Sequence, residues 1–358
     1  MTKKQIYHSD CKHFLGHIPC KPHKKYGVHC DNCQFYDKKT GKILIIKLGA
    51  IGDVIRTTPL LHKLWEVHRD KEIWWVTEYP NILPSAIDKI LKLDHKSILQ
   101  LQNTEFDVVI NLDKDYEACA LTKSIVAKNK VGFTLEKGKP APIDQRAEPK
   151  FMTGLFDDIN KKNTKSYPQE IFEICGWKFE KQEYLIDVED HYWSIDNGKK
   201  KIIGLNTGCG DRWTSRLIPD STWIELIKAI QKKGYYPLLL GGSQEHHKNE
   251  YLADVTKATY LGHFSLEKFI SLINKCDLVV SVVTMASHLA IGLKKPIVLI
   301  NNIFNSNEFE LYGRGQIVEP VKKCQCYFSP KCTNEDYSCI EHVTAEAIFK
   351  AIKRNLKA

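Results

Sequence analysis

The stretch over residues 42–61, KILIIKLGAIGDVIRTTPLL, constrains the fold more than any other part of the chain. Residues 43–47 form a nearly continuous apolar run, which is typical of a strand buried on both faces of a parallel sheet. A short turn with Gly49 and Gly52 follows, and Asp53 then opens an amphipathic segment. The pattern predicts a strand, a turn and a helix, with a carboxylate at the strand end, where open α/β sheets bind ligands. An ordinary β–α unit, in which Asp53 only starts the helix, is the alternative.

Alternating strands and helices continue along the chain and favour an α/β fold with two domains. A length of 358 residues is long for a single core. We expect a Rossmann-like domain over residues 42–190 and a second one over residues 200–358, joined by the polar residues 186–200. The cleft between two such facing domains is the default place for a ligand.

Three local expectations concern the first domain. The spacing of apolar residues predicts a helix over residues 82–93 and a short strand or a loop over residues 97–101. Polar residues with prolines and glycines predict loops that face a cleft over residues 134–165.

The composition limits the partners and the compartment. The formal charge is +9, with 52 basic and 43 acidic residues, which suits an anionic partner. The basic residues are spread along the chain rather than gathered in one element, so we expect no nucleic-acid partner. No apolar h-region follows the N-terminus and no run of about 18 apolar residues occurs, so we expect a cytoplasmic protein.

Twelve cysteines in a reducing compartment point to metal ligation rather than to disulfides. Residues 1–41 form a Cys- and His-rich module that ends in a C-x2-C pair, as structural zinc sites do. The module is too small and polar to bury its own core, so we expect a zinc or iron ion, or docking on the main body, to stabilise it. Buried reduced thiols are the alternative. The four cysteines of the module are Cys11, Cys20, Cys30 and Cys33.

The first of three candidate turns in the second domain follows a strand that ends near residue 206. It carries glycines, hydroxyls and two arginines, which can hold phosphate through N–H groups and guanidinium forks. The candidate residues are Thr207, Gly208, Arg212 and Arg216. A surface loop with scattered cations is the alternative.

The other two turns also follow strands. Glu245 comes after a Gly-Gly turn and can accept hydrogen bonds from ribose hydroxyls, although a tight turn before a helix gives the same pattern. At Thr284 a helix begins, and its free N–H groups with the Thr hydroxyl make an anion site, or Thr284 is only the N-cap. His288 lies one turn further on, where a structural role is the more common one.

Five segments together resemble the motifs of glycosyltransferase family 9, the bacterial ADP-heptose heptosyltransferases. They occur in the order of that family and cover most of residues 42–305. The resemblance implies a GT-B fold of two Rossmann-like domains and inverting transfer that needs no metal or other cofactor for the chemistry. The segments are ILIIKLGAIGDVIRTTPLL, NTGCGDRWTSRLIP, LLLGGSQE, LGHFSLEKFISLINKCDLVVS and VVTMASHLAIGLKKPIVLI.

The resemblance also assigns roles to residues. Asp53 matches the general base, which would take the proton of an acceptor hydroxyl, and Gly49 and Gly52 shape its turn. Arg212 or Arg216 matches the basic residue near the donor diphosphate, and Arg216 has the better spacing to the following proline. Glu245 falls near the ribose-binding acid. The start of the diphosphate-binding helix corresponds to Thr284, Met285, Ala286 and His288.

Three functions stay open at this stage. The first is inverting transfer of a heptose from ADP-heptose to a lipopolysaccharide core or another surface glycan. The second is heptosylation of a protein, because the C-terminal cysteines resemble those of heptosyltransferases that modify autotransporters, some of which hold iron. The third is a non-catalytic nucleotide-binding assembly module, because Met285 stands where the family often has glycine. A lipid-linked acceptor, peripheral contact with the inner membrane and an oligomer are compatible with each. The C-terminal cysteines, a second candidate zinc or iron site, are Cys324, Cys326, Cys332 and Cys339.

Overall fold

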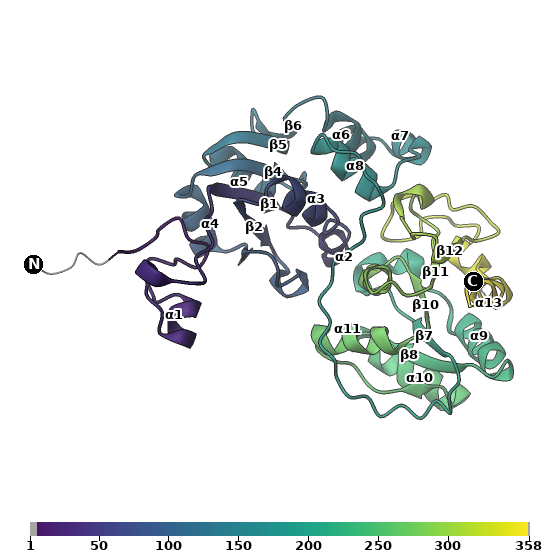
Figure 1. The fold of residues 1–358 in the computed structure, drawn as a ribbon. Coiled ribbons are helices and arrows are strands. Elements are labelled where there is room, and N and C mark those ends of the chain that lie inside the picture. The colour runs from purple at the N-terminus through teal and green to yellow at the C-terminus, as the bar shows by residue number, and fades with distance from the viewer. Residues whose placement is uncertain (1–5, 357–358) are drawn as a thin grey trace, which may run out of the picture. The chain divides into compact units, whose positions relative to one another are not determined.

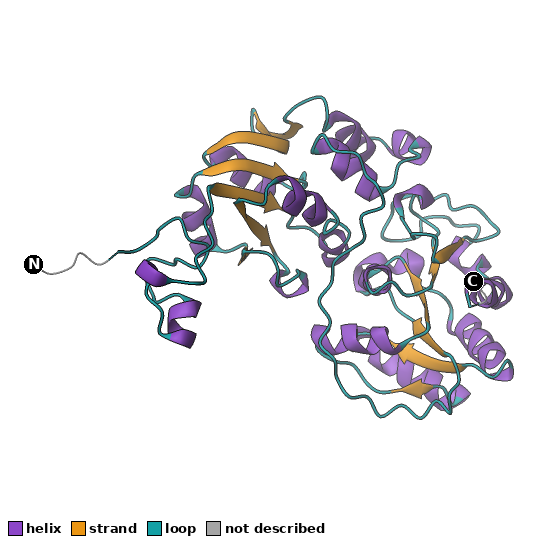
Figure 2. Ribbon diagram, viewed as in Figure 1, coloured by secondary structure: helices purple, strands orange, loops and turns teal. Residues whose placement is uncertain are grey.

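The computed structural model describes residues 6–356, which fall into two compact units. The first unit contains Met1–Gly49 and Leu60–Glu148, and the second contains Ala50–Pro59 and Pro149–Ala358. Each unit has a six-stranded sheet with helices against it (Figures 1 and 2). The expected α/β fold with two parallel-sheet domains is confirmed. The limits of the units differ from the expected ones, because residues 50–59 and 149–190 belong to the second unit.

The sheet of the first unit has the strand order β3-β2-β1-β4-β5-β6, which is the Rossmann order. All neighbours are parallel except β5 and β6, which are antiparallel. Buried apolar side chains of β1, β2 and β4 form its core. The strands are β1 Gly41–Ile46, β2 Lys71–Thr77, β3 Lys89–Lys92, β4 Phe106–Asn111, β5 Ala127–Glu136 and β6 Lys139–Pro142. The helices are α1 Lys21–Tyr26, α3 Leu60–Val67, α4 His95–Gln102 and α5 Tyr116–Ser124, with 3-10 turns η1 Cys30–Asn32 and η2 Pro80–Ile82.

The sheet of the second unit has the order β12-β11-β10-β7-β8-β9 and is parallel throughout. It has the same Rossmann order as the first sheet, with β7 and β10 at the central reversal. The strands are β7 Ile202–Asn206, β8 Tyr236–Leu240, β9 Thr259–Tyr260, β10 Leu278–Val282, β11 Ile297–Ile300 and β12 Gly315–Val318.

Helices α9, α10, α12 and α13 of the second unit contact this sheet, and α9, α10 and α13 contribute side chains to its buried core. Two other helices of the unit, α6 and α7, lie within residues 134–165, where loops are expected. The helices are α2 Ile51–Ile55, α6 Glu148–Leu155, α7 Asp157–Lys162, α8 Tyr167–Ile174, α9 Asp220–Lys232, α10 His246–Thr256, α11 Leu266–Lys275, α12 Met285–Gly292 and α13 Ala345–Asn355. The 3-10 turns are η3 Asp211–Arg216, η4 Ser243–Glu245, η5 Ser306–Glu308 and η6 Cys339–His342.

Three local expectations are wrong, for identifiable reasons. Within residues 82–93, β3 pairs with β2 instead of forming a helix, and the carboxylate of Asp88 accepts a 2.8 Å hydrogen bond from the backbone N–H of Ile73. Residues 97–101 belong to helix α4, because the side chain of Asp94 caps its first turn. Residues 134–165 are not only loops, since β5 and β6 pair as a hairpin within them.

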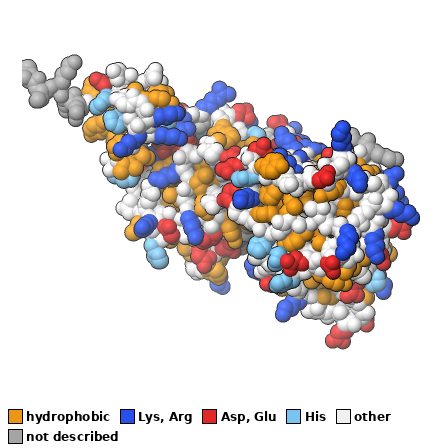
Figure 3. Space-filling model, turned by 90° about the horizontal axis from the view of Figure 1, so that it is seen from below, with side chains coloured by type: hydrophobic (Ala, Val, Ile, Leu, Met, Phe, Trp, Pro, Cys, Tyr) orange, Lys and Arg blue, Asp and Glu red, His pale blue; other side chains and the backbone are white. Residues whose placement is uncertain are grey.

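Two further observations concern the charges on one face of the molecule and the length of its helices. On the face drawn in Figure 3, lysine and arginine side chains are scattered among acidic and hydrophobic ones. Within residues 6–356, the helices are too short and too polar for any of them to cross a membrane.

Candidate active site

The centre of the second sheet positions the candidate site. The amide of Asn206, at the end of β7, donates hydrogen bonds to the carbonyl of Gly208 at 3.0 Å and to the hydroxyl of Ser281 on β10 at 3.2 Å. These bonds hold the turn after β7 beside the end of β10. Helix α12 begins next to it, where Thr284 is the N-cap and its backbone N–H donates to the Ser287 hydroxyl at 3.1 Å. Two turns and a helix start therefore meet at the carboxyl edge of the sheet, where such sheets bind ligands.

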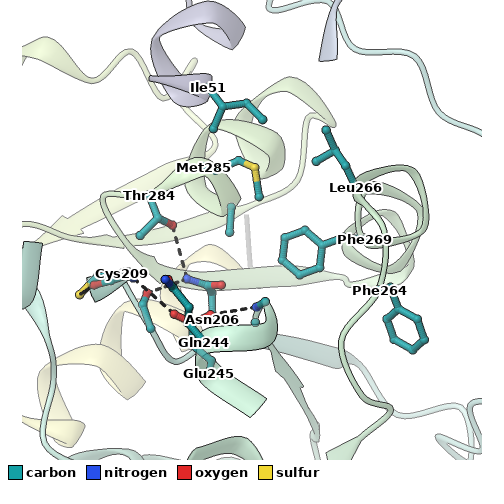
Figure 4. A pocket seen from close by; sticks show the side chains of 15 residues that line it. Ile51, Asn206, Cys209, Gln244, Glu245, Phe264, Leu266, Phe269, Thr284 and Met285 are labelled. Atoms are coloured by element: carbon teal, nitrogen blue, oxygen red, sulfur yellow. Dashed lines mark hydrogen bonds between the residues drawn. The ribbon is translucent and has the colours of Figure 1, made fainter. Parts of the chain in front are cut away.

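A pocket of about 450 Å³ opens at this edge (Figure 4). One side of the pocket is polar and comes from the turns after β7 and β8. The other side is apolar and comes from α11 and the segment before it. A volume of this size and a wall of this mixed character suit a ligand with a flat ring and several polar groups. The polar side includes Asn206, Gly208, Gly242, Gln244 and Glu245, and the apolar side includes Phe264, Leu266 and Phe269.

Glu245 joins the two polar turns. Its carboxylate accepts hydrogen bonds from the backbone N–H of Gly242 at 2.9 Å and from that of Gly210 at 3.3 Å. A Cβ atom at Gly208 would collide with the Glu245 side chain, so a larger residue would displace that carboxylate. Thr207 is buried, and its hydroxyl donates to the side-chain oxygen of Asn249 at 2.5 Å. Glu245 and Gly208 therefore line the pocket, whereas Thr207 does not line it and holds the turn in place through Asn249.

A second pocket of about 280 Å³ adjoins the first. The two share four lining residues, which are Ile51, Cys209, Thr284 and Met285. Ala286 lines the first pocket only, and the second brings together the side chains of Asp53, Arg216 and His288. Asp53 reaches this pocket because the short helix α2 packs on α12 within the second unit.

Arg216 is the cation that lines this pocket without an acidic partner. Its guanidinium donates to the carbonyl of Val283 and lies over the rings of Trp213 and Phe304, with Cζ 5.6 and 5.4 Å from their centroids. Within residues 6–356 no carboxylate forms an ion pair with it. Burial lowers the pKa of Arg216, because burial disfavours the charged form. Arg212 is exposed and lines neither pocket.

Asp53 lies at the mouth of the second pocket, with its side chain about one third exposed. One carboxylate oxygen, Oδ1, forms a 2.8 Å ion pair with Nη2 of Arg56. The other terminal nitrogen of Arg56, Nη1, lies 3.4 Å from a carboxylate oxygen of Glu308. Sequence reasoning missed both Arg56 and Glu308. The i,i+3 spacing of Asp53 and Arg56 is a signal for the first, but Glu308 is 252 residues away in sequence and has no such signal.

His288 is a buried and neutral group that lines the same pocket as Asp53. Burial lowers its pKa to about 3, and the nearby charges of Arg56 and Arg216 lower it further while Asp53 opposes them. A Cβ atom at Gly52 would lie 2.6 Å from Cδ2 of the imidazole, so α2 approaches α12 through this glycine. A histidine with such a pKa does not exchange protons near neutral pH. His288 therefore supports the position of α2.

Gly49 belongs to the first unit and has a different role. Its backbone N–H donates to Asp113 Oδ2 at 2.9 Å, and the N–H of Leu48 donates to the same oxygen at 2.5 Å. Lys47 forms a buried ion pair with this carboxylate. Asp113, at the end of β4, thus holds the turn after β1, and sequence reasoning had not singled it out.

The candidate metal ligands gather in two places. In the N-terminal module, a cavity of about 30 Å³ is lined by Cys11, Cys20, Cys30 and Cys33, with His8 and His13. Near the C-terminus, the sulfur atoms of Cys326 and Cys332 lie 3.6 Å apart, and the backbone N–H of Cys326 donates to the sulfur of Cys324 at 3.2 Å. The amide of Asn302 donates to the sulfur of Cys339 at 3.3 Å. In the described part of the chain, no three His, Cys, Asp or Glu side chains already have the geometry of a metal site.

Comparison with known proteins identifies relatives of one kind. The family described as glycosyltransferase family 9 (heptosyltransferase) matches residues 95–337. The lipopolysaccharide core heptosyltransferase OpsX of Haemophilus influenzae is 23% identical over 286 residues, which cover 72% of this chain and 77% of OpsX. Lipopolysaccharide heptosyltransferase 1 of Campylobacter coli is 21% identical over 348 residues, which cover 87% of this chain and 98% of that protein.

Solved structures with the same fold include three glycosyltransferases. A family 9 glycosyltransferase from Veillonella parvula has a TM-score of 0.67 at 17% identity, covering 89% of this chain and 98% of its own. The E. coli heptosyltransferase WaaC, solved with ADP-2-deoxy-2-fluoro heptose, has a TM-score of 0.61 at 17% identity, covering 88% and 99%. The iron-containing dodecameric glycosyltransferase TibC from enterotoxigenic E. coli has a TM-score of 0.57 at 14% identity, covering 89% and 77%. At these identities the likeness shows the fold.

Proposed function

The chain belongs to glycosyltransferase family 9, and we propose that it transfers a heptose from ADP-heptose to a hydroxyl of the lipopolysaccharide core or another surface glycan. One observation carries the proposal. A carboxylate, Asp53, and a buried cation without an acidic partner, Arg216, line one pocket that adjoins a nucleotide-sized pocket. The names of the relatives from Haemophilus influenzae and Campylobacter coli support the lipopolysaccharide acceptor.

The larger pocket suits the nucleoside part of the donor. Its apolar side, with Phe264 and Phe269, offers surfaces on which a purine ring can pack. Its polar side offers Glu245, whose oxygens keep acceptor capacity for ribose hydroxyls besides the two backbone N–H groups they already bind. The WaaC structure with an ADP-heptose analogue supports ADP as the nucleotide.

The smaller pocket suits the reacting atoms. An acceptor hydroxyl attacks the anomeric carbon as Asp53 takes its proton, and the bond from that carbon to the diphosphate oxygen breaks. ADP leaves with the electron pair of that bond, and the sugar inverts because attack and departure occur on opposite faces. Arg216 and the N–H groups at the start of α12, beside Thr284, stabilise the negative charge that develops on the diphosphate. These groups supply the stabilisation without a metal ion.

The test uses the purified full chain with ADP-heptose and a truncated lipopolysaccharide acceptor. We expect released ADP and an acceptor heavier by one heptose. The variant Asp53→Asn should lose about 100-fold or more of the transfer rate and keep donor binding, since it removes only the base. Wild-type rates in Asp53→Asn would overturn the role of Asp53, and no sugar transfer by the wild type to any acceptor would overturn the proposed function.

A protein acceptor is the second candidate. The C-terminal cysteines and the structural likeness to iron-containing TibC favour it. Incubation with ADP-heptose and an autotransporter protein, followed by intact mass measurement, distinguishes the two acceptors. Heptose additions on the protein and none on the lipopolysaccharide would favour this second candidate.

We also propose that the two cysteine groups hold structural zinc or iron. The 3.6 Å distance between the sulfurs of Cys326 and Cys332 supports the C-terminal site, because two thiolates of a tetrahedral zinc site lie roughly 3.8 Å apart. The cavity of about 30 Å³ among the N-terminal cysteines supports the other, because it leaves room for one small bound group between the thiols.

A further inference from the structure

Arg56 is held more firmly than a surface arginine. Its side chain is about 13% exposed, and its guanidinium lies over the ring of Tyr167 with Cζ 3.8 Å from the centroid. One terminal nitrogen bonds Asp53 and the other faces Glu308. Burial alone would lower the pKa of Arg56, yet the two carboxylates raise it above its ordinary value. The guanidinium therefore stays charged between two acids.

Glu308 is fixed from the opposite side. It ends the short turn η5, and its own side chain is about 8% exposed. The turn is anchored through Asn305, whose amide donates 2.6 Å hydrogen bonds to the carbonyls of Asn160 and Asn163. A fixed Glu308 holds one end of the planar guanidinium, so the other end meets Asp53 in one geometry.

Two of the titratable groups near this pair are uncharged near neutral pH. His288 of α12 is neutral, because burial lowers its pKa to about 3. Burial raises the pKa of Tyr184, which keeps that hydroxyl protonated. Arg216 of η3 is the further charge. Titratable and charged groups near Asp53 or Arg56 include Glu308, His288, Arg216, Tyr167 and Tyr184.

We propose that Arg56 and Glu308 form a positioning pair that orients the Asp53 carboxylate and sets the pH at which it becomes a base. This inference rests on the proposed function, in which Asp53 is the base. Arg56 keeps Asp53 ionised, and Glu308 limits that effect by sharing the guanidinium. Removal of Arg56 and removal of Glu308 should therefore shift this pH in opposite directions.

The test is the pH dependence of kcat/KM for sugar transfer. Arg56→Met removes a positive charge from Asp53, so the acidic limb should move to higher pH by about one unit. Glu308→Gln removes the competing acid, so the limb should move to lower pH. Arg56→Lys should restore the position of the limb and not the full rate, because lysine lacks the planar fork.

Arg314→Met is the matched control. Arg314 forms a bidentate ion pair with Glu183 at 2.6 and 2.7 Å in the same unit and lines neither pocket. Its loss should leave the acidic limb in place. An unmoved limb in both Arg56→Met and Glu308→Gln, with folding intact, would overturn the proposal and leave the pair a structural role.

A second measurement separates this inference from the proposed function. Titration of the Asp53 carboxyl carbon by NMR, in the protein without substrate, should give a higher midpoint in Arg56→Met and a lower one in Glu308→Gln. If the wild type transfers no sugar but these shifts occur, the proposed function fails and the pairing stands. If transfer occurs and the midpoints do not move, the pairing fails alone.

Discussion

At the scale of residues, Asp53 and Arg216 line one pocket but differ in whether a residue of opposite charge pairs with them. Asp53 has the counter-ion Arg56, whereas Arg216 is buried without a carboxylate within residues 6–356. A buried charge without a counter-ion costs stability, and the cost falls when an anion binds. In the proposed function, Arg216 is the residue whose charge an incoming diphosphate neutralises, whereas Asp53 already has a cationic partner before any substrate arrives.

The first prediction concerns Arg216→Met. Loss of the guanidinium should weaken ADP binding by about 10-fold or more, because a charge-assisted contact to phosphate is lost. The same change should leave unchanged or raise the melting temperature of the protein without nucleotide, because it removes an uncompensated buried charge. Calorimetric titration with ADP and thermal unfolding measure the two effects.

Arg212→Met is the matched control for this variant. Arg212 lies in the same turn, is exposed, and lines neither pocket. We expect near wild-type ADP affinity. Equal losses in both variants would mean that the general charge of the turn, and not the buried position of Arg216, attracts the nucleotide.

At the scale of elements, the strands were the most predictable part of the chain. The apolar runs in β1, β7, β8, β10 and β11 are buried on both faces, which makes the sequence pattern unambiguous. Helix α4 was missed although Asp94 gives a capping signal, because the short apolar run after it suits a strand equally well. Strand β3 owes its form to pairing with β2, and tertiary pairing of this kind has no local signature.

The candidate site was predictable where chemistry follows a strand end. Asp53, Glu245 and Thr284 each follow a strand closely, and all three line the pockets. The sequence favoured Arg216 over Arg212 through its spacing to the following proline, but the burial of one and the exposure of the other depend on the packing of η3. Glu308 could not be found, because its link to Arg56 exists only after folding.

The amphipathic segment after Asp53 was expected as one helix and is two. Helix α2 ends at Ile55 and α3 begins at Leu60, with Pro59 between them. Proline lacks the N–H that a continuous helix needs. The break has a structural consequence, because α2 clusters with the second unit and α3 with the first.

The second prediction concerns Gly52→Ala in α2. The added Cβ would lie 2.6 Å from Cδ2 and 3.2 Å from Nε2 of the His288 imidazole, so α2 or the ring must move. Because α2 carries Asp53, we expect kcat to fall by about 10-fold or more while ADP affinity changes little. Steady-state kinetics and ADP titration separate the two.

Two further variants sharpen this prediction. At Gly49, shortly before α2, a Cβ would meet its nearest atom at 3.4 Å, so Gly49→Ala should be close to neutral. Combining Gly52→Ala with His288→Ala removes the collision and should recover part of the lost rate. If the double variant is no faster than Gly52→Ala, the contact with His288 is not the cause.

At the scale of the whole molecule, the motif over residues 42–61 serves both units. Its strand β1 lies in the middle of the first sheet, and its helix α2 completes the pocket of the second unit. All the residues that line the two pockets, Asp53 included, belong to the second unit. The proposed donor pocket and the proposed base therefore both belong to the second unit, although the motif begins in the first sheet.

The last prediction concerns the two cysteine groups. Residues 6–40 bury few apolar side chains, so the N-terminal module has almost no core of its own. If metal supplies the missing stability, protein purified without chelators should contain zinc or iron. Cys30→Ser with Cys33→Ser should remove the metal of the module, and Cys326→Ser with Cys332→Ser that of the C-terminal site. Elemental analysis measures each loss.

Cys119→Ser with Cys276→Ser is the matched control, since both thiols are buried and lie outside the two groups. Its metal content should equal that of the wild type. Limited proteolysis adds a structural readout, because removal of metal should expose cleavage sites within residues 6–40 or 324–339 and not in the two sheets. A folded, protease-resistant protein that contains no metal would overturn both sites, and metal loss in only one double variant would restrict the proposal to that site.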